Sequence, residues 1–418
     1  MIVLLLPLVA AILVWGHFSP PEQSDEEEHM YAFVLTSVAK PTPKCERFEA
    51  KVLPKGETYL YLLRDSTRAM PEYGDTVIAY THIEREHRVG RAFAAKYTVR
   101  PARDHTLPLQ YRLYKRLEAA GLEGDELATV GALTLGYKED IDPEVKRHFQ
   151  ASGAAHVLAV SGLHTGIIYG FLLMLMTLGG RIRPRYENRA GRWTISLVII
   201  AVMWFYAWLT GLTPSVVRAV IMVSLVEIGK MAYRRSPSLN TIASAAVLIL
   251  LVRPTDLWSV SFQLSFAATT AIVLVARQAE RFLPRKEWLQ TLGGRIASWL
   301  AGIVIVSLAA QIGTLPITLY FFGQASTYFL LTNLIVLPLA SFLVPFGLVT
   351  IVLGGSVAGI WVGKVTWALA WVMNHAVGWI ESLPGSTIPG HINGWMVIIY
   401  YVIIAFYIIL FAYSKKKQ

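Results

Sequence analysis

The stretch VLAVSGLHTGIIYGFLLMLMTL (residues 157–178) contains no Asp, Glu, Lys or Arg and becomes almost wholly apolar after its first third. The hydrocarbon core of a bilayer is about 30 Å thick, and a helix of about 20 apolar residues crosses it. The stretch has this length and composition. It therefore predicts a membrane-spanning helix.

Similar apolar runs follow this stretch to the end of the chain. They cover residues 193–212, 215–232, 239–252, 257–276, 297–320, 327–353, 357–380 and 394–413. Within the sixth and seventh of the nine spans, Pro316, Pro338 and Pro345 are candidates to break the helices into halves. Hydrophobic residues make up 54% of the chain and charged residues only 16%, whereas about a quarter of a soluble domain is charged. A string of soluble domains is therefore excluded.

The chain before residue 156 is more polar. Short runs with alternating or β-branched residues, at 31–38, 46–53, 58–63 and 75–82, predict strands of a small barrel, with an OB-like barrel as the obvious candidate. The fold class is thus a polytopic α-helical membrane protein with an external OB-like β-barrel domain. The expected organisation is a transmembrane helix at 1–16, an acidic linker at 17–29, the barrel at 30–105, a partly amphipathic helical connector at 106–155, the multi-span domain at 156–413 and a basic tail at 414–418.

Basic residues in the loops predict the orientation in the membrane. Clusters lie at 181–192, 230–235, 277–286 and 415–417. If every span crosses once, all four fall on one side, which the positive-inside rule assigns to the cytoplasm. The barrel then lies outside, and the net charge of +10 needs no soluble nucleic-acid-binding domain to explain it. Cys45 is the only cysteine, so an internal disulfide is excluded and a buried bystander role is expected.

Polar residues inside apolar spans are costly and are often functional. They gather in four segments, at 156–164, 211–219, 261–266 and 311–316, the last followed by Asn333. The candidate channel-lining or motif residues are His156, Ser161, Gly162, His164, Pro214, Arg218, Gln263, Ser265, Gln311, Pro316 and Asn333. Each is equally compatible with hydrogen bonds that hold the helices together. For Arg218, snorkelling of the guanidinium to the outer interface is a further possibility.

HVLAVSGLHTG at residues 156–166 resembles the signature of the ComEC family of competence proteins. GLTPSVVRA at 211–219, FQLSFAA at 262–268 and QIGTLPITLYFFGQAS at 311–326 resemble the other core motifs of that family, in the same order. The resemblance extends over about residues 30–380. It implies an inner-membrane channel that moves single-stranded DNA into the cytoplasm during natural transformation. Implied partners are single-stranded DNA, membrane lipid, a competence DNA receptor, and cytoplasmic motor or DNA-binding proteins.

The barrel would then meet DNA first. Residues 30–100 hold 12 Lys and Arg against 8 Asp and Glu, a net +4. Tyr31, Phe33, Tyr59, Tyr61 and Tyr80 are candidates for stacking on bases, with Arg64 and Arg68 near them. The predicted DNA-binding residues are Tyr59, Tyr61, Arg64 and Arg68. The alternative for each aromatic residue is the barrel core.

Two departures from the family bear on function. Many members continue into a metallo-β-lactamase-like domain, but the sequence has no H-x-H-x-D-H zinc signature. No nuclease activity, metal or cofactor is therefore expected. Only 1–16 precede the barrel, so we expect a short variant or a truncated reading frame. Two other functions stay open: a transporter of small solutes or lipid precursors using Arg218, and an intramembrane serine hydrolase using Ser161 with His156 or His164.

Overall fold

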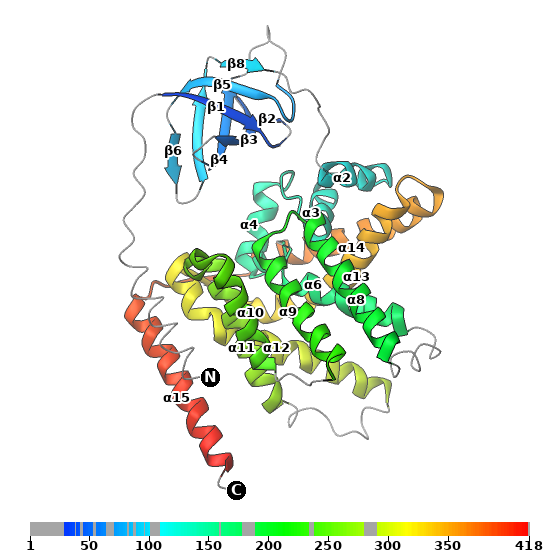
Figure 1. The fold of residues 1–418 in the computed structure, drawn as a ribbon, viewed down its shortest axis with the longest axis vertical. Coiled ribbons are helices and arrows are strands. Elements are labelled where there is room, and N and C mark those ends of the chain that lie inside the picture. The colour runs from blue at the N-terminus through cyan, green and yellow to red at the C-terminus, as the bar shows by residue number, and fades with distance from the viewer. Residues whose placement is uncertain are drawn as a thin grey trace. The chain divides into compact units, whose positions relative to one another are not determined.

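A computed structural model covers the 418-residue chain. It describes residues 29–37, 39–41, 45–52, 56–63, 71–81, 83–86, 89–95, 97–100, 109–158, 160–177, 189–233, 238–279 and 291–416. The chain divides into two compact units (Figure 1). One is Phe18–Arg112, and the other is Met1–His17 with Leu113–Gln418. The expected helix at 1–16 and the acidic linker lie outside the described residues.

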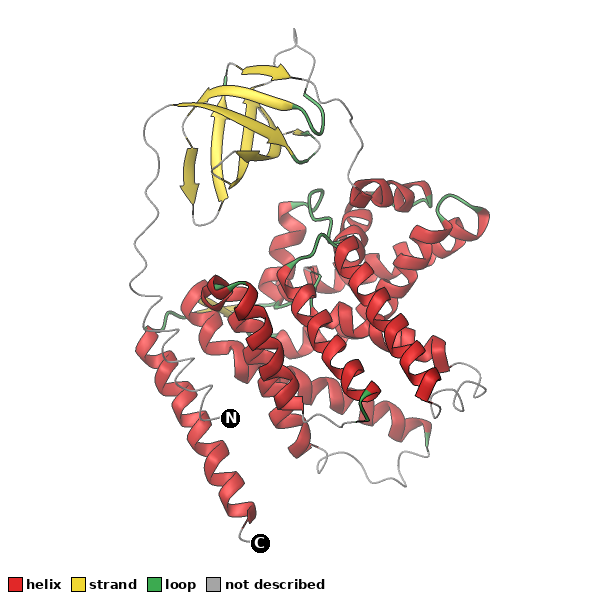
Figure 2. Cartoon of the chain, in the orientation of Figure 1, coloured by secondary structure: helices red, strands yellow, loops and turns green. Residues whose placement is uncertain are grey.

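The first unit is a β domain whose strands form one sheet (Figure 2). The strands are β1 (His29–Leu35), β2 (Lys40–Pro41), β3 (Cys45–Val52), β4 (Gly56–Leu63), β5 (Thr76–Thr81), β6 (Ile83–Glu86), β7 (Val89–Ala94) and β8 (Tyr97–Arg100). The four runs of the sequence appear as β1, β3, β4 and β5, with ends shifted by up to three residues. The other four strands are short or carry charged residues, so the sequence pattern did not reveal them.

Strand pairing in the β domain is mixed. β1 pairs antiparallel with both β3 and β5, and β3 pairs antiparallel with β4. β4 pairs in parallel with β7, which pairs antiparallel with β6. One residue separates β6 from β5, and the Thr81 hydroxyl at the end of β5 donates to the Phe93 carbonyl of β7 at 2.8 Å. Pairing thus leads from β1 through β3, β4, β7 and β6 back to β5 and β1.

Alternate residues of these strands point into a common core. Phe33, Phe48 and Leu60 are fully buried there, and Tyr31 is 8% exposed. Burial of Tyr31 and Phe33 removes them as candidates for stacking on bases, because their rings already pack in the apolar interior. The alternation with period 2 on β3 and β5 is the expected signature of strands with one buried face.

The second unit is helical. In chain order its elements are α2 (Leu109–Ala119, which begins in the first unit), α3 (Gly124–Leu135), α4 (Pro143–Ser152), α5 (Ala155–Leu158), α6 (Gly162–Thr177), α8 (Arg189–Leu209), α9 (Pro214–Met231), α10 (Ser238–Val252), η1 (Pro254–Trp258), α11 (Val260–Ala279), α12 (Leu292–Phe322), β9 (Gln324–Ser326), α13 (Phe329–Leu353), α14 (Val357–Glu381), β10 (Thr387–Pro389) and α15 (Gly394–Lys416).

Three of the described helices are long and apolar enough to cross a membrane, namely residues 191–209, 293–322 and 329–353. Shorter apolar helices cover 162–176, 239–252, 260–275 and 394–404. The prolines do not divide α12 or α13. Pro316 lies inside the continuous α12, and Pro338 and Pro345 lie inside the continuous α13. Membrane-spanning helices tolerate such prolines. Neighbouring helices, Ser and Thr side chains and ordered waters form hydrogen bonds with the backbone groups that proline leaves unpaired.

Helix α3 is enclosed by the other helices of this unit. Every residue from Leu127 to Leu135 is buried, and α3 packs against α13 and α14. A helix that is apolar all round belongs in the interior of a large bundle. The Cβ of a residue at Gly347 of α13 would lie 2.6 Å from the Thr134 methyl, so glycine permits this close approach.

Gly313 of α12 permits a similarly close approach between α12 and α11. An added Cβ there would lie 2.7 Å from both the Ala267 carbonyl oxygen and the Ala271 Cβ. Gly302, on the same helix, has nothing within 4 Å of that position. We expect Gly313→Ala to lower the free energy of unfolding by about 1–3 kcal/mol, because α11 and α12 must separate.

Gly302→Ala is the matched control. Alanine is favoured over glycine in a helix by up to about 1 kcal/mol, so this variant should be neutral or slightly more stable. Chemical unfolding of the purified chain in detergent micelles measures both. Equal stability of the two variants would show that the helices are not in the close contact seen here.

Candidate functional site

The first motif does not lie on one helix. The sequence predicts a span that begins at residue 157, but α5 ends at Leu158 and α6 begins at Gly162. Ser161 caps α6: its hydroxyl accepts from the Leu163 N–H at 3.3 Å, and its carbonyl accepts from the Thr165 N–H at 3.2 Å. A serine that satisfies free N–H groups favours a new helix start here. His156 and His164 therefore lie on different helices.

The predicted contact between Ser161 and His164 is present. His164 is fully buried, and its Nδ1 lies 3.1 Å from both the Ser161 N–H nitrogen and the Ser161 hydroxyl. Because the backbone N–H must donate, Nδ1 is the acceptor and the proton belongs on Nε2. Nε2 is buried and has no hydrogen-bond partner among the described residues. A hydrolase needs a third group that orients the base, so this arrangement disfavours the serine-hydrolase hypothesis.

The start of α9 meets the first motif. Ser215 donates its hydroxyl to the Val160 carbonyl at 2.7 Å. A Cβ at Gly162 would lie 3.7 Å from the Ala219 Cβ, an ordinary van der Waals contact. Pro214 is the first residue of α9, where its fixed φ and missing N–H are well tolerated. The first two motif segments therefore lie side by side.

Arg218 connects α9 to the third motif segment. Its side chain is 2% exposed, and Nη2 donates to the Ser261 carbonyl at 2.9 Å and the Ser261 hydroxyl at 2.8 Å. Arg218 is therefore held inside the helical unit, and the snorkelling alternative is wrong for this conformation. Three of the four motif segments thus meet where α6, α9 and α11 begin.

The remaining predicted residues lie elsewhere or make local contacts. Gln263 donates to the Leu257 carbonyl at 3.3 Å, and Ser265 accepts the Thr269 hydroxyl through its carbonyl at 2.7 Å. Pro316 lies in α12, as does Gln311, whereas Asn333 is a buried residue of α13. The described residues give no hydrogen bond that joins Gln311 or Asn333 to the three segments that meet.

The loop after α3 brings one lysine, Lys138, near the first motif. Gly136 lies against Val160 and the Thr210 carbonyl. Lys138 follows in this loop and, like His156, acts electrostatically on His164. Burial lowers the pKa of Lys138, and the nearby charge of Lys146 lowers it further. Glu139, Asp140 and Asp142 follow Lys138 in the same loop, so the charge beside this motif is mixed.

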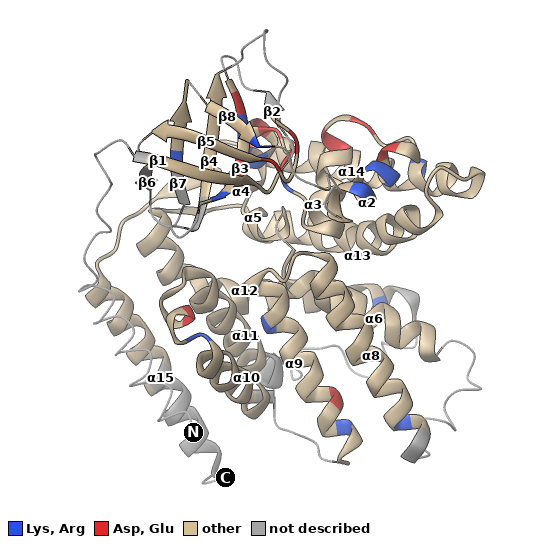
Figure 3. Cartoon of the chain, turned by 45° about the horizontal axis from the view of Figure 1, so that its top comes forward, with Lys and Arg blue, Asp and Glu red and all other residues tan. Residues whose placement is uncertain are grey.

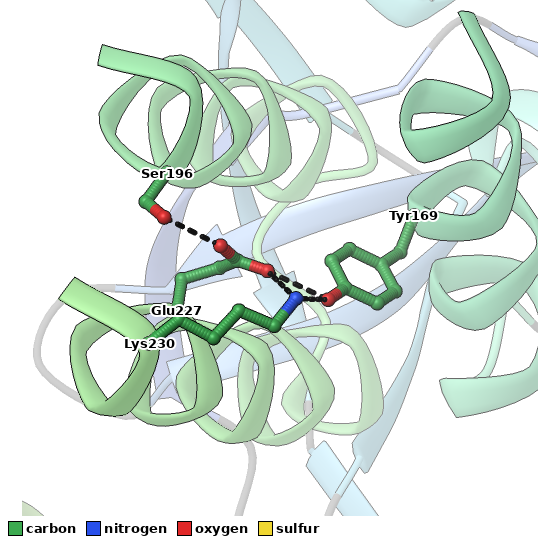
Figure 4. Close-up of polar contacts among 4 residues, drawn as sticks. All are labelled: Tyr169, Ser196, Glu227 and Lys230. Atoms are coloured by element: carbon green, nitrogen blue, oxygen red, sulfur yellow. Dashed lines mark hydrogen bonds and ion pairs between the residues drawn. The ribbon is translucent and has the colours of Figure 1, made fainter. Parts of the chain in front are cut away.

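A second polar cluster was not found from the sequence (Figure 4). Glu227 of α9 is fully buried and accepts hydrogen bonds from Tyr169 of α6 at 2.6 Å and Ser196 of α8 at 2.7 Å. Lys230 lies 2.7 Å from both the Glu227 carboxylate and the Tyr169 hydroxyl. The sequence signal was available: an acidic and a basic residue three positions apart in an otherwise apolar run. Lys230 is also the first residue of the basic cluster at 230–235.

The β domain carries a partly exposed face on β3, β4 and β7 that is rich in aromatic and basic residues and also holds Glu49, opposite Tyr59. Tyr61 is opposite Arg47 on one side and Phe93 on the other, and its ring stacks on Phe93 with centroids 4.6 Å apart. Arg47 also lies over the Tyr59 ring at 5.3 Å, and Tyr59 is opposite Arg91. Phe93 is 55% exposed. We name these five aromatic and basic residues the β3–β4–β7 face; Arg64 and Arg68 lie outside the described residues.

The fold defines a class. Apolar helices long enough to cross a membrane form the body, charged residues are sparse on most of its helices (Figure 3), and a separate β domain precedes them. In the described part of the chain, no group of three or more His, Cys, Asp and Glu residues is placed to hold a metal ion. The molecule is a helical membrane protein with a β domain.

The chain belongs to the Competence protein family, whose match covers residues 133–414. It is 30% identical to ComE operon protein 3 of Bacillus subtilis over 63% of this chain and 29% of that protein. It is 25% identical to competence protein ComA of Neisseria gonorrhoeae over 48% of this chain and 28% of that protein. An uncharacterized protein of Aquifex aeolicus is 32% identical over 43% of this chain and 37% of its own length.

The chain thus spans between 28% and 37% of the length of these relatives. No solved structure matches it significantly.

Proposed function

We propose that the chain is a component of an inner-membrane channel that passes single-stranded DNA into the cytoplasm during natural transformation. Membership of the Competence protein family and the names of two relatives support a role in DNA uptake. The observation that carries the proposal is the meeting of three motif segments around buried His164 and Arg218. Polar groups gathered inside an apolar helical body are typical of a transport path.

The direction of transport follows from the loop charges. Lys230, at the end of α9, belongs to one of the basic clusters that the positive-inside rule assigns to the cytoplasm. Arg218 and the meeting motifs lie near the opposite end of the same helix. The proposed entrance for DNA is therefore on the outer side, together with the β domain.

Strand pairing supports an OB-like barrel for this domain. With β5 and β6 counted as one bent strand, the five main strands in chain order are β1, β3, β4, β5–β6 and β7. Numbered 1 to 5 in that sequence, these strands pair in the order 1-2-3-5-4-1. The pair of the third and the fifth strand, β4 and β7, is parallel. OB folds have this arrangement and bind oligonucleotides on the face of strands 2 and 3. The β3–β4–β7 face occupies that position.

Removal of both stacking rings tests this assignment. We expect Tyr61→Ala with Phe93→Ala to weaken binding of a short oligothymidine to the full chain by about 10–100-fold. Base stacking on an aromatic side chain contributes about 1–3 kcal/mol. Binding by the unsubstituted chain should fall steeply with salt, because phosphate contacts release counterions. Fluorescence anisotropy of a labelled oligonucleotide measures both quantities.

Tyr80→Ala is the matched control. Tyr80 is 61% exposed on β5, which pairs with β1 and β8 rather than with β4 or β7. Its removal should leave binding unchanged. An affinity that the double substitution does not alter, or that does not depend on salt, would contradict a DNA-receiving role for the β3–β4–β7 face.

In this proposal the chain carries out no covalent chemistry. A competence DNA receptor would deliver the strand, and cytoplasmic motor or DNA-binding proteins would draw it inward. A transporter of small solutes or lipid precursors would also place polar residues inside the helical body. It would not require the β domain to bind oligonucleotides, so the binding measurement separates the two functions.

A further inference from the structure

Arg218 has more hydrogen-bond donors than partners. The guanidinium group carries five N–H bonds, and the two on Nη2 are directed at the carbonyl and hydroxyl of Ser261. Nε and Nη1 are buried and have no partner among the described residues. Three N–H bonds of a cation that is 2% exposed are therefore unsatisfied. Such a group is costly unless something else accepts these bonds.

The surroundings make the charge less favourable still. Arg218 lies one turn after the start of α9, and helical side chains lean toward the N-terminus of their helix. Its partner Ser261 lies in the first turn of α11. The N-terminus of a helix carries a partial positive charge, so two positive helix ends lie beside one buried cation.

Thr213 adds another unused donor at the same place. It is the N-cap residue of α9, but its hydroxyl makes no capping bond. The hydroxyl oxygen is buried and has no partner among the described residues. Pro214 has no N–H, and the N–H groups of Val216 and Val217 donate to the Thr213 carbonyl. The start of α9 thus combines an unused hydroxyl, the N–H of Ser215 and the unused N–H bonds of Arg218. All of them suit an anion.

The protein's own carboxylates do not fill this role. Asp256 of η1 acts electrostatically on Arg218. However, no ion pair within 4.0 Å joins these two residues or links Arg218 to any other described carboxylate. Asp256 reduces the unfavourable charge from a distance and leaves the N–H bonds free.

The site lies directly below the protein surface. Gly211, Leu212 and Pro214 of the turn before α9 are exposed, and so is Ser261. We place the approach of a small anion at this exposed turn, with the Ser261 side chain turned aside.

We propose that Arg218, the Thr213 hydroxyl and the Ser215 N–H at the start of α9 form a binding site for a phosphodiester group. Guanidinium groups and helix N-termini both bind phosphate oxygens well. A DNA strand in transit, which rests on the function proposed above, and the headgroup of an anionic lipid are the two sources of this group. In the first case the site holds one backbone phosphate at the entrance of the channel.

The test uses the full chain in nanodiscs of phosphatidylcholine, with dimethyl phosphate as the probe and chloride added to keep the ionic strength constant. Binding to the folded state alone should raise the melting temperature by about 2–4 °C. Arg218→Met should abolish this rise. Arg295→Met, which removes an exposed arginine of α12, should retain it. No rise in the unsubstituted chain, or an equal rise in Arg218→Met, would overturn the proposal.

Two further variants cover the case in which Arg218→Met does not fold. Thr213→Val removes only the hydroxyl donor and should reduce the rise. Asp256→Asn removes the neighbouring negative charge and should increase it. If neither variant changes the rise, dimethyl phosphate binds elsewhere and the assignment is wrong.

The source of the phosphodiester is determined in two further arms. One adds oligothymidine to the phosphatidylcholine nanodiscs, and the other replaces part of the lipid by phosphatidylglycerol without DNA. A rise that depends on Arg218 in the first arm assigns the site to DNA, and one in the second arm assigns it to lipid. Dimethyl phosphate binding does not require DNA transport. An intact site in a chain that passes no DNA would therefore contradict the proposed function alone.

Discussion

Replacing Lys230 with methionine is expected to lower the free energy of unfolding by about 3 kcal/mol, at the lower end of a range of about 3–5 kcal/mol. This is the usual cost of removing one partner from a buried ion pair. The substitution leaves the fully buried Glu227 carboxylate with only the hydroxyl groups of Tyr169 and Ser196. Lys230 is 35% exposed, so water can replace part of its contribution. Chemical unfolding of the purified chain in detergent micelles, followed by tryptophan fluorescence, measures the change.

The double variant Glu227→Gln with Lys230→Met should recover much of this loss. Glutamine keeps the shape and leaves no uncompensated charge: its carbonyl oxygen accepts from one of the two hydroxyl groups, and its NH2 group donates to the oxygen of the other. Arg295→Met on α12 is the control, because Arg295 is an exposed surface residue and its loss should change stability by no more than about 0.5 kcal/mol. A double variant as unstable as Lys230→Met alone would show that the two charges are not coupled.

The cluster explains why three helices hold together at this end of the bundle. Glu227 belongs to α9, Tyr169 to α6 and Ser196 to α8 (Figure 4), so the hydrogen bonds that Glu227 accepts from Tyr169 and Ser196 cross between helices. At the other end, Ser215 joins α9 to the carbonyl before α6. Helix α6, which contains the last residues of the first motif, is therefore bound to α9 near both of its ends.

Much of the architecture was predictable because the signals are strong and local. Apolar runs of membrane-spanning length gave α8, α12, α13 and α14 to within a few residues at most ends. Alternating residues gave β3, β4 and β5. In contrast, the start of α6 at Gly162 was missed, because a capping serine inside an apolar run does not alter the hydropathy that marks a span.

The candidate site was predictable as a set of residues but not as a geometry. The contact of Ser161 with His164 follows from their spacing. The pairing of Arg218 with Ser261 joins residues 43 positions apart and depends on helix packing. For the same reason the sequence could not decide between core and surface for aromatic residues of the β domain. Tyr31 and Phe33 are buried, whereas Tyr80 and Phe93 are exposed.

Loss of the gene is expected to abolish natural transformation in the organism that carries it, with growth unchanged. A channel for the incoming strand has no substitute once it is removed, whereas a transporter of lipid precursors or solutes would affect growth. The gene returned in its original form should restore transformation, and the Arg218→Met form should restore it poorly. Transformation frequency with a selectable marker measures all three strains.

The most direct measurement of the central claim is the amount of labelled donor DNA that reaches the cytoplasm. Cells with and without the gene take up DNA labelled throughout, are treated with external nuclease, and are fractionated. If this chain forms part of the channel, cells lacking the gene still bind DNA at the surface but contain no protected single-stranded label in the cytoplasm. An equal amount of cytoplasmic label in both strains would contradict the proposal that this chain forms part of the channel.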